Sequence, residues 1–289
     1  EMNALRRVLV PKKAWEHVKS AHEAIVIPDG ALAQLPFEAL VTVPGPNWAA
    51  SKLWLDSGPT IRYAASATSL ANVTARTANR AQGAPSTLSV SDPSFDRSLA
   101  RLPGTARESA AVALAFREAG FPDAVVLLAG PAATESEVKR ELSGKRFLHL
   151  ATHGIVEPGR NELLAGLALT DGMLQLFEIQ ELKLDADLVA LSACDTNVGR
   201  RVAGEGVFSL GRGFFAAGAR RVVASLWPVD DDASARLIGD LFRAIAQAEA
   251  AGREAHPADA LREAKQTLRA ETATSAPFYW AAFTCAGVR

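Results

Sequence analysis

The stretch DLVALSACDTNVG, Asp187 to Gly199, opens on a largely unbroken apolar run and ends in small and polar residues. An alternating strand exposes one face to water, whereas a continuous apolar run is typical of a strand buried on both faces, as in a parallel sheet covered by helices. Cys194 stands where this run ends. It is either a small buried hydrophobic residue or a nucleophile placed at the edge of a sheet.

A second apolar run, RFLHLATHG, ends in the pair His153–Gly154. In an open parallel sheet, binding and catalytic sites form beyond the carboxyl ends of the strands. The chain between the two runs is long enough for one crossover connection, so we expect the two strands to be neighbours. His153 and Cys194 would then lie at the same edge of the sheet.

Further apolar runs alternate with helical patterns along most of the chain, which predicts an α/β fold with parallel strands. Strands are predicted at 23–30, 59–64, 86–93, 123–130, 220–227 and 279–287. Helix starts are marked by capping-box spacing at Thr105 with Glu108 and at Thr134 with Glu137, by acidic residues at Asp230 to Asp232, and by Pro257. The polar segment Asn79 to Ser86 is the best internal boundary. It divides the chain into a smaller lead-in region, 1–84, and a six-stranded α/β domain, 85–289.

Composition excludes several classes of protein. The 289 residues carry a net charge of -1, which favours neither nucleic acid nor an anionic membrane surface as a partner. No apolar run reaches the roughly 18 residues of a membrane helix. Two cysteines without a CxxC motif predict neither a disulfide framework nor a zinc site. No signal peptide is visible, so we expect a soluble, cytoplasmic protein. The first residues, EMNALRR, suggest a piece of a longer protein.

Histidine and cysteine together can perform acyl transfer. A thiol needs a base to form a thiolate at neutral pH, and His153 would serve Cys194 in this way. The backbone N–H groups of Gly154 and Cys194 could hold the developing oxyanion. Each residue also has a structural interpretation, since a lone cysteine or histidine is usually part of the core or the surface. We expect His149 and Cys285 to be core residues, and the remaining histidines, at 17, 22 and 256, to lie at the surface.

The order of these motifs resembles a known family. The segments that carry the resemblance are VIPDGALAQLPFEAL, RYAASATSL, LPGTARESA, HLATHG, LALTDGMLQLFEIQELKLDADLVALSACDT, GEGVFSLGRGFFAAGARRVVASLWPVDDDAS and PFYWAAFTCAG. They resemble the caspase-type cysteine peptidases, which include separases, gingipains and legumains. More narrowly they resemble the CHAT domain, a bacterial caspase-like module commonly found beside TPR repeats. The caspase signature Gln-Ala-Cys-x-Gly is absent, and SACDT stands in its place.

The resemblance implies a caspase-like three-layer fold and a cysteine endopeptidase that needs no metal or cofactor. In it, Cys194 is the nucleophile, His153 is the base and acid, and Gly154 and Cys194 form the oxyanion hole. The implied substrate is a protein cut at one or few sites, and the implied regulator is a neighbouring TPR-like or sensor domain. The alternatives are a catalytically silent interaction module of the same fold, and acyl transfer by the same cysteine.

The substrate side is open to more than one interpretation. The segment SLWPVDDD resembles the wall along which an extended peptide pairs as an added strand. Trp227 is then a pocket wall, or else a core tryptophan. Acidic residues at 157, 195, 205 and 230–232 favour a basic residue before the cut, with Asp195, Asp230, Asp231 and Asp232 as candidate contacts. However, relatives that demand a basic residue often carry an aspartate two positions before the nucleophile, where this chain has Ser192. Arg200, Arg201 and Arg212 would instead favour an acidic residue, and a neutral one also stays open.

Overall fold

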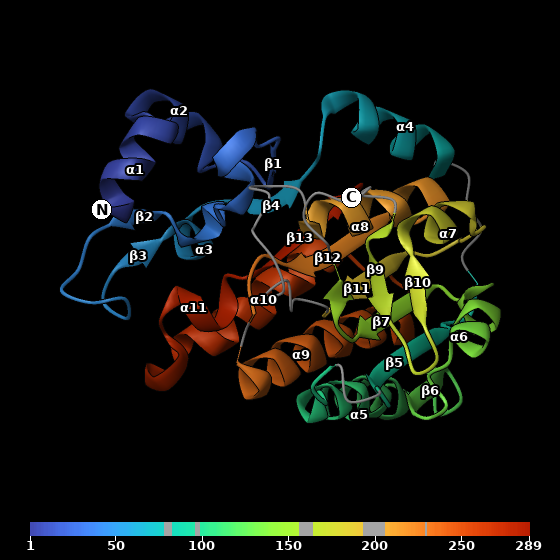
Figure 1. The fold of residues 1–289 in the computed structure, drawn as a ribbon. Helices are drawn as coiled ribbons and strands as arrows, with labels where there is room; N and C mark the ends of the chain where they lie inside the picture. Colours follow the sequence, from blue (N-terminus) through green and yellow to red (C-terminus); the bar gives the residue numbers. More distant parts are fainter. Residues whose placement is uncertain (78–82, 96–98, 156–163, 193–205, 229) are drawn as a thin grey trace.

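An eight-stranded sheet forms the centre of the molecule (Figure 1). The computed structural model describes residues 1–77, 83–95, 99–155, 164–192, 206–228 and 230–289. The strands follow the order β1-β4-β13-β12-β11-β7-β5-β6, and every neighbouring pair is parallel except β12 with β13. Their bounds are β1 Glu23–Val26, β4 Thr60–Tyr63, β5 Thr87–Pro93, β6 Val125–Gly130, β7 Phe147–Ala151, β11 Leu188–Leu191, β12 Arg221–Ser225 and β13 Phe283–Gly287. All eight predicted strands are therefore present in one sheet.

Helices cover both faces of this sheet. Side chains of a strand alternate between faces, and in β7 Phe147 joins the core under α5, α9 and α10, whereas Leu148 joins the core under α6, α7 and α8. Both faces are thus buried, which explains the continuous apolar runs and gives the expected three layers. The helices on these two faces are α5 Pro103–Glu118, α6 Glu135–Leu142, α7 Leu176–Glu181, α8 Gly206–Ala217, α9 Asp231–Ala250 and α10 Pro257–Ala270.

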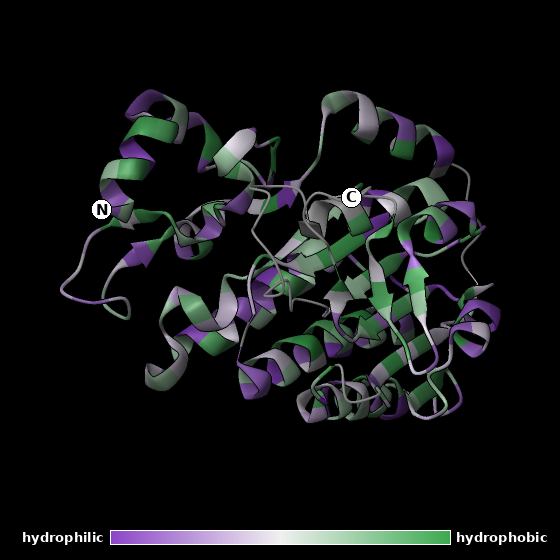
Figure 2. Cartoon of the chain, in the orientation of Figure 1, coloured by the Kyte–Doolittle hydropathy of each residue, from purple (hydrophilic) through white to green (hydrophobic). Residues whose placement is uncertain are grey.

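The remaining elements are short or lie at the periphery. The helices are α1 Met2–Leu9, α2 Lys12–Val18, α3 Trp54–Ser57, α4 Ala67–Thr77 and α11 Pro277–Trp280, with 3-10 turns at Gly30–Gln34, Phe37–Ala39 and Thr272–Thr274. Two small antiparallel sheets consist of β2 Val41–Val43 with β3 Lys52–Leu53, and of β8 Gly154–Ile155, β9 Gly166–Ala168 and β10 Met173–Gln175. Hydrophobic residues gather in the central strands, and hydrophilic ones mark the outer faces of the helices (Figure 2). Among the described helices, none combines the length and apolar character needed to cross a membrane.

The lead-in region is joined to the large sheet. It has a small core of its own, in which Trp54 packs edge-on against Trp15 at 5.0 Å between ring centroids. Its strands β1 and β4 nevertheless extend the sheet beside β13, so the sheet has eight strands where six were expected from residue 85 onward. The division at residue 84 stays a prediction.

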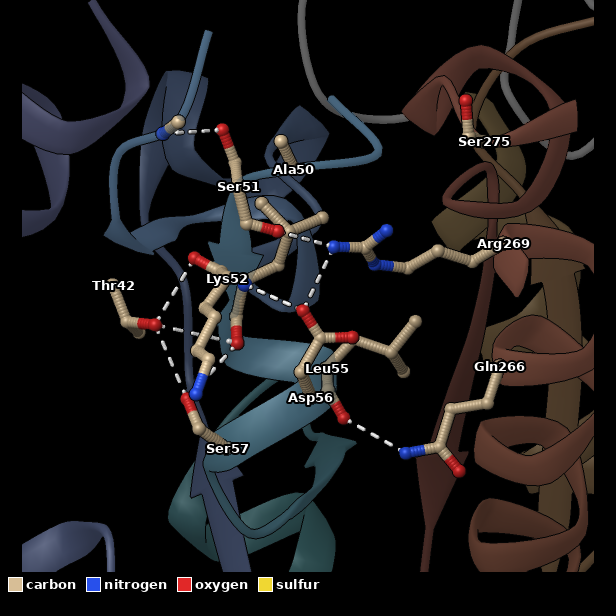
Figure 3. A network of polar contacts seen from close by, with 12 residues as sticks. Thr42, Ala50, Ser51, Lys52, Leu55, Asp56, Ser57, Gln266, Arg269 and Ser275 are labelled. Carbon is tan, nitrogen blue, oxygen red and sulfur yellow. Dashed lines mark hydrogen bonds and ion pairs between the residues drawn. The ribbon is translucent and has the colours of Figure 1, made fainter. Parts of the chain in front are cut away.

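Polar contacts also tie the lead-in to α10 (Figure 3). Arg269 of α10 donates to the carbonyl of Ser51 (2.6 Å) and to the carboxylate of Asp56 (2.8 Å). Deeper in the molecule, Lys265 donates to Glu38 (2.7 Å), and both side chains are buried. Buried charges persist where they are paired, so these contacts fix α10 against the lead-in.

Helix starts agree with the sequence in part. Thr134 caps α6 by accepting from the Glu137 N–H, Asp230 caps α9, and Pro257 is the first residue of α10. The capping box at Thr105 with Glu108 is wrong, because α5 begins at Pro103 and its N-cap is Leu102. Both side chains are used in tertiary contacts described below.

Candidate active site

Strands β7 and β11 are parallel neighbours, as the positions of His153 and Cys194 in the sequence predict. Their register pairs Phe147 with Leu188 and Leu150 with Leu191, and the Ser192 N–H donates to the Leu150 carbonyl (3.0 Å). The two strands therefore end together at one edge of the sheet. His153 follows β7 at this edge. Cys194 and Asp195 lie outside the described residues, as do the charged residues 157, 200, 201 and 205.

His153 is held by a backbone carbonyl. The residue is 3% exposed, its ring centroid lies 5.1 Å from that of Phe95, and its Nε2 lies 2.8 Å from the carbonyl oxygen of Ala100. A carbonyl oxygen can only accept a hydrogen bond, so Nε2 carries a proton. In the neutral ring, Nδ1 is then the nitrogen with the lone pair, which is the nitrogen that can take a proton from a thiol.

Gly154 directly follows His153 and begins β8. In the antiparallel pair β8–β9, Gly154 lies opposite Leu167, and the preceding pair is bonded through the Ala168 N–H to the His153 carbonyl (2.9 Å). Bonded and non-bonded pairs alternate in an antiparallel ladder. Gly154 therefore occupies a non-bonded pair, and its N–H faces away from β9. This is the property that an oxyanion-hole donor requires.

A buried polar network connects α5 to both strands of the site. Glu108 is 3% exposed, and its carboxylate accepts from His149 Nε2 (2.9 Å) and from the Ser192 hydroxyl (3.0 Å). His149 Nδ1 faces the hydroxyl of Ser89 (2.8 Å). A neutral ring protonated at Nε2 satisfies both of its contacts. His149 is thus a core residue, as expected, and the Ser192 side chain is turned toward Glu108.

Sequence reasoning missed this role of Glu108. The spacing Thr-x-x-Glu before an apolar run indicated a helix cap. The hydrogen bonds that the Glu108 carboxylate makes with residues far away in the chain leave no signal in the local sequence. The signal that could have found it is His149, a polar residue inside an apolar run with no assigned partner in the sequence.

The candidate substrate residues have clear structural neighbours. Trp227 follows β12, is half-buried against the core under α9, and donates from Nε1 to the Phe278 carbonyl (3.2 Å). It thus contributes to the core and keeps a partly open face. Asp230 is the N-cap of α9, with Oδ1 accepting from the N–H groups of Asp232 and Ala233 at 3.1 and 3.0 Å.

The other two aspartates of this group, Asp231 and Asp232, pair with Arg107 of α5 at 3.9 and 2.7 Å. All three acidic residues therefore have partners within the chain. Their contact with a substrate stays a prediction.

Cys285 lies in β13 and is 1% exposed. Burial raises the pKa of its thiol to about 12, because the surrounding core disfavours the thiolate. Such a thiol stays protonated and is inert at neutral pH. Cys285 is a core residue, as expected.

Comparison with known proteins places this geometry in a wider context. The chain is 32% identical over 119 residues to tetratricopeptide repeat protein 28 of Mus musculus and to that of Homo sapiens, which covers 41% of this chain and 5% and 4% of those proteins. This chain therefore spans only a small part of the relatives' length.

Solved structures show the same fold. The Arg-specific cysteine proteinase gingipain R is similar with a TM-score of 0.62 at 10% identity, over 99% of this chain and 66% of that one. Separase in the Saccharomyces cerevisiae separase–securin complex is similar with a TM-score of 0.56 at 13% identity, over 91% of this chain and 15% of that one. The fold is thus caspase-like.

The sequence profile of the CHAT domain matches residues 1–288, which includes the lead-in region as well as the three-layer domain. The expected resemblance is confirmed, and the chain belongs to the CHAT domain family.

Proposed function

We propose that this chain is a cysteine endopeptidase with a dyad of His153 and Cys194. One observation carries the proposal: β7, which His153 follows, lies beside β11, whose continuation bears Cys194, and His153 Nε2 is held by the Ala100 carbonyl. This arrangement leaves Nδ1 as the basic nitrogen at the edge of the sheet where sites form. Membership of the CHAT family and the caspase-like fold support the same reading.

In the proposed mechanism, His153 Nδ1 takes the thiol proton and the Cys194 thiolate attacks the carbonyl carbon of the scissile bond. The N–H groups of Gly154 and Cys194 hold the oxygen that becomes negative. The tetrahedral intermediate collapses, and His153 gives its proton to the leaving amine. Water, deprotonated by His153, then attacks the thioester, and the carboxyl product leaves as the thiol is restored.

The proposed substrate is a protein bound as an extended strand along the segment after β12, with Trp227 as one wall. The TPR-protein relatives support a neighbouring repeat domain that regulates the enzyme. We expect the chain alone to be weakly active, because its site depends on segments outside the strands, and to gain activity when its native flanking domain is attached.

Active-site labelling tests the proposal. The purified chain is treated with fluorescent peptidyl acyloxymethyl ketones that carry arginine, aspartate or leucine next to the reactive group. We expect slow but stoichiometric labelling of the native protein and none of Cys194→Ala. Cys285→Ser should label like the native protein, since its thiol is buried.

His153→Ala should slow labelling to the rate of a free thiol at the same pH. Loss of His153 and loss of Cys194 should each abolish hydrolysis of a cleaved peptide as fully as losing both, by roughly 10⁴-fold or more, because the two groups act as a unit. Retained hydrolysis in either folded single variant would overturn the dyad. Absence of labelling with the native flanking domain attached would favour a silent interaction module.

A further inference from the structure

The carboxylate of Asp92 sits at the end of β5, the strand beside β7 on the side away from β11. Its backbone φ is 41°, and within the described part of the chain it is the one residue other than glycine with positive φ. Asp92 is buried, with 7% of its surface exposed. A strained φ of this kind persists only where the surroundings determine it.

Three sets of hydrogen bonds surround Asp92. Its Oδ1 accepts from Arg101 Nε (2.8 Å) and from the Leu102 N–H (3.0 Å), and its Oδ2 accepts from Arg101 Nη2. Its own N–H donates to the Thr105 hydroxyl (2.8 Å), which donates to the Leu102 carbonyl (2.7 Å). The hydrogen bonds from Arg101 lower the pKa of Asp92, so the carboxylate is charged at neutral pH. We name this group, Asp92 with Arg101, Leu102 and Thr105, the Asp92 clamp.

The Asp92 clamp fixes the residue next to it. Ala100 directly precedes Arg101, and its carbonyl is the group that accepts from His153 Nε2 (2.8 Å). Ala100 is itself exposed, so its own side chain does not anchor it in the core. The hydrogen bonds from Arg101 and Leu102 to the Asp92 carboxylate tie this stretch to the sheet. Loss of the Asp92 carboxylate would therefore free the Ala100 carbonyl from the imidazole.

We propose that Asp92 is a positioning residue, which holds the Ala100 carbonyl against His153 Nε2 and thereby keeps the proton on Nε2 and the lone pair on Nδ1. Its effect on catalysis rests on the proposed function, whereas its effect on the His153 ring does not. A wrong tautomer would present an N–H to the thiol and could not take its proton.

Two variants separate the effect of losing the Asp92 carboxylate from the effect of backbone strain. Asp92→Gly removes the side chain and tolerates positive φ, so the loss of the clamp is not confused with backbone strain. Asp92→Asn keeps an acceptor for the Leu102 N–H, tolerates the same φ, and loses the charge that binds Arg101.

Asp56→Asn is the matched control. Asp56 also accepts from a backbone N–H, that of Leu53 (2.7 Å), and from an arginine, Arg269 (2.8 Å), but it lies in α3 of the lead-in (Figure 3).

The direct readout is the tautomer of His153 in the whole chain. Long-range nitrogen–proton NMR spectra distinguish Nδ1–H from Nε2–H, and comparison with His153→Gln assigns this ring among the five histidines. In the native protein and in Asp56→Asn we expect the neutral His153 to be protonated at Nε2. In Asp92→Gly we expect a mixture of both tautomers, with Asp92→Asn in between. Native tautomer shifts in folded Asp92→Gly would overturn the proposal.

The kinetic readout is alkylation by the peptidyl acyloxymethyl ketone that labels the native protein best. Asp92→Gly should lower the maximal inactivation rate by ~100-fold, the scale of a misplaced catalytic group, with little change in the inhibitor concentration at half-maximal rate. An unchanged rate together with an altered tautomer would show that His153 is not the base, which contradicts the proposed function and leaves the positioning role standing. An altered rate with a native tautomer would overturn the positioning role.

Discussion

At the residue scale, Cys285 offers a test of burial alone. Its thiol is protonated in the folded protein up to about pH 12, whereas in the unfolded chain it ionises near its ordinary pKa of 9.0. The folded pKa is raised, so the stability that this thiol contributes is complete below pH 9 and is lost as pH rises toward 12. Cys285→Ser should unfold with about 1–3 kcal/mol less free energy at neutral pH, because a hydroxyl is placed in the core.

The pH dependence of the unfolding free energy distinguishes the raised pKa of the Cys285 thiol from a simple loss of packing. The advantage of the native protein over Cys285→Ser, measured by urea unfolding, should shrink by roughly 1 kcal/mol per pH unit above the ordinary thiol pKa. Val223→Ala removes a side chain opposite Cys285 in β12 and changes no titratable group. The loss of unfolding free energy in Val223→Ala should stay constant over the same pH range. A constant loss in Cys285→Ser as well would refute the raised pKa of the thiol.

Glu108 provides a second prediction at this scale. Glu108→Ala leaves His149 Nε2 and the Ser192 hydroxyl without their acceptor, at a cost of about 1–3 kcal/mol for each group left unpaired. Glu118→Ala, at the exposed end of the same helix, should change stability by less than about 0.5 kcal/mol. Urea unfolding of the two variants checks the difference. Equal costs would mean that water replaces the carboxylate.

Single residues show where sequence reasoning reaches its limit. Cys285 and His149 could be placed in the core because apolar neighbours surround them in the sequence. The partners of His149, Glu108 and Ser89, lie 41 and 60 positions away. Thr105 and Glu108 match a local cap pattern, yet Thr105 binds Asp92 and Glu108 binds His149. A local pattern cannot reveal which of two uses of a polar side chain has the lower free energy.

At the scale of elements, the strands were the most predictable part. Most of the eight strands are short apolar runs, and burial of both faces of the central strands removes the alternation that would otherwise be needed to recognise them. That β7 and β11 are neighbours followed from the length of chain between them, which allows one crossover connection. The joining of β1 and β4 to the sheet did not, because sheet order depends on long-range packing that no single run encodes.

The start of α9 tests whether an acidic residue serves the helix or a substrate. Asp230→Ala should cost about 1 kcal/mol of unfolding free energy, because Asp230 Oδ1 caps two N–H groups. Asp230→Asn keeps an acceptor and should cost little. Asp232→Ala removes a charge in the first turn without removing the cap, and should cost a few tenths of a kcal/mol.

Thermal unfolding measures these three stabilities, and the inhibitor panel measures preference in the same variants. Asp230→Asn with native stability and a reduced preference for arginine would assign Asp230 to the substrate. An unchanged preference for arginine in Asp230→Asn, together with the loss of stability in Asp230→Ala, would assign Asp230 to the helix.

At the scale of the whole molecule, the lead-in and the three-layer domain share one sheet and a buried ion pair. Lys265 of α10 is 1% exposed and donates to Glu38, whose other oxygen accepts from the Tyr63 hydroxyl (2.6 Å). Burial raises the pKa of the Tyr63 hydroxyl, and the neighbouring carboxylate of Glu38 raises it further. Helix, lead-in turn and sheet strand therefore meet at one carboxylate, and we expect the two regions to unfold together.

Lys265→Met should lower the stability of both regions at once. Removing the ammonium leaves the Glu38 charge buried with one partner fewer, which costs about 3–5 kcal/mol. Hydrogen exchange measured by mass spectrometry at increasing urea reports peptides of β4 and β7 separately. In the native protein, the amides of both strands should exchange through the same unfolding event. In Lys265→Met, the urea concentration at which each strand exchanges should fall by the same amount. Lys52→Met, an exposed lysine of the lead-in, should leave both unchanged. Exchange of β4 at lower urea than β7 in the native protein would instead make residues 1–84 a separate folding unit, since an element that opens alone cannot draw its stability from the shared sheet.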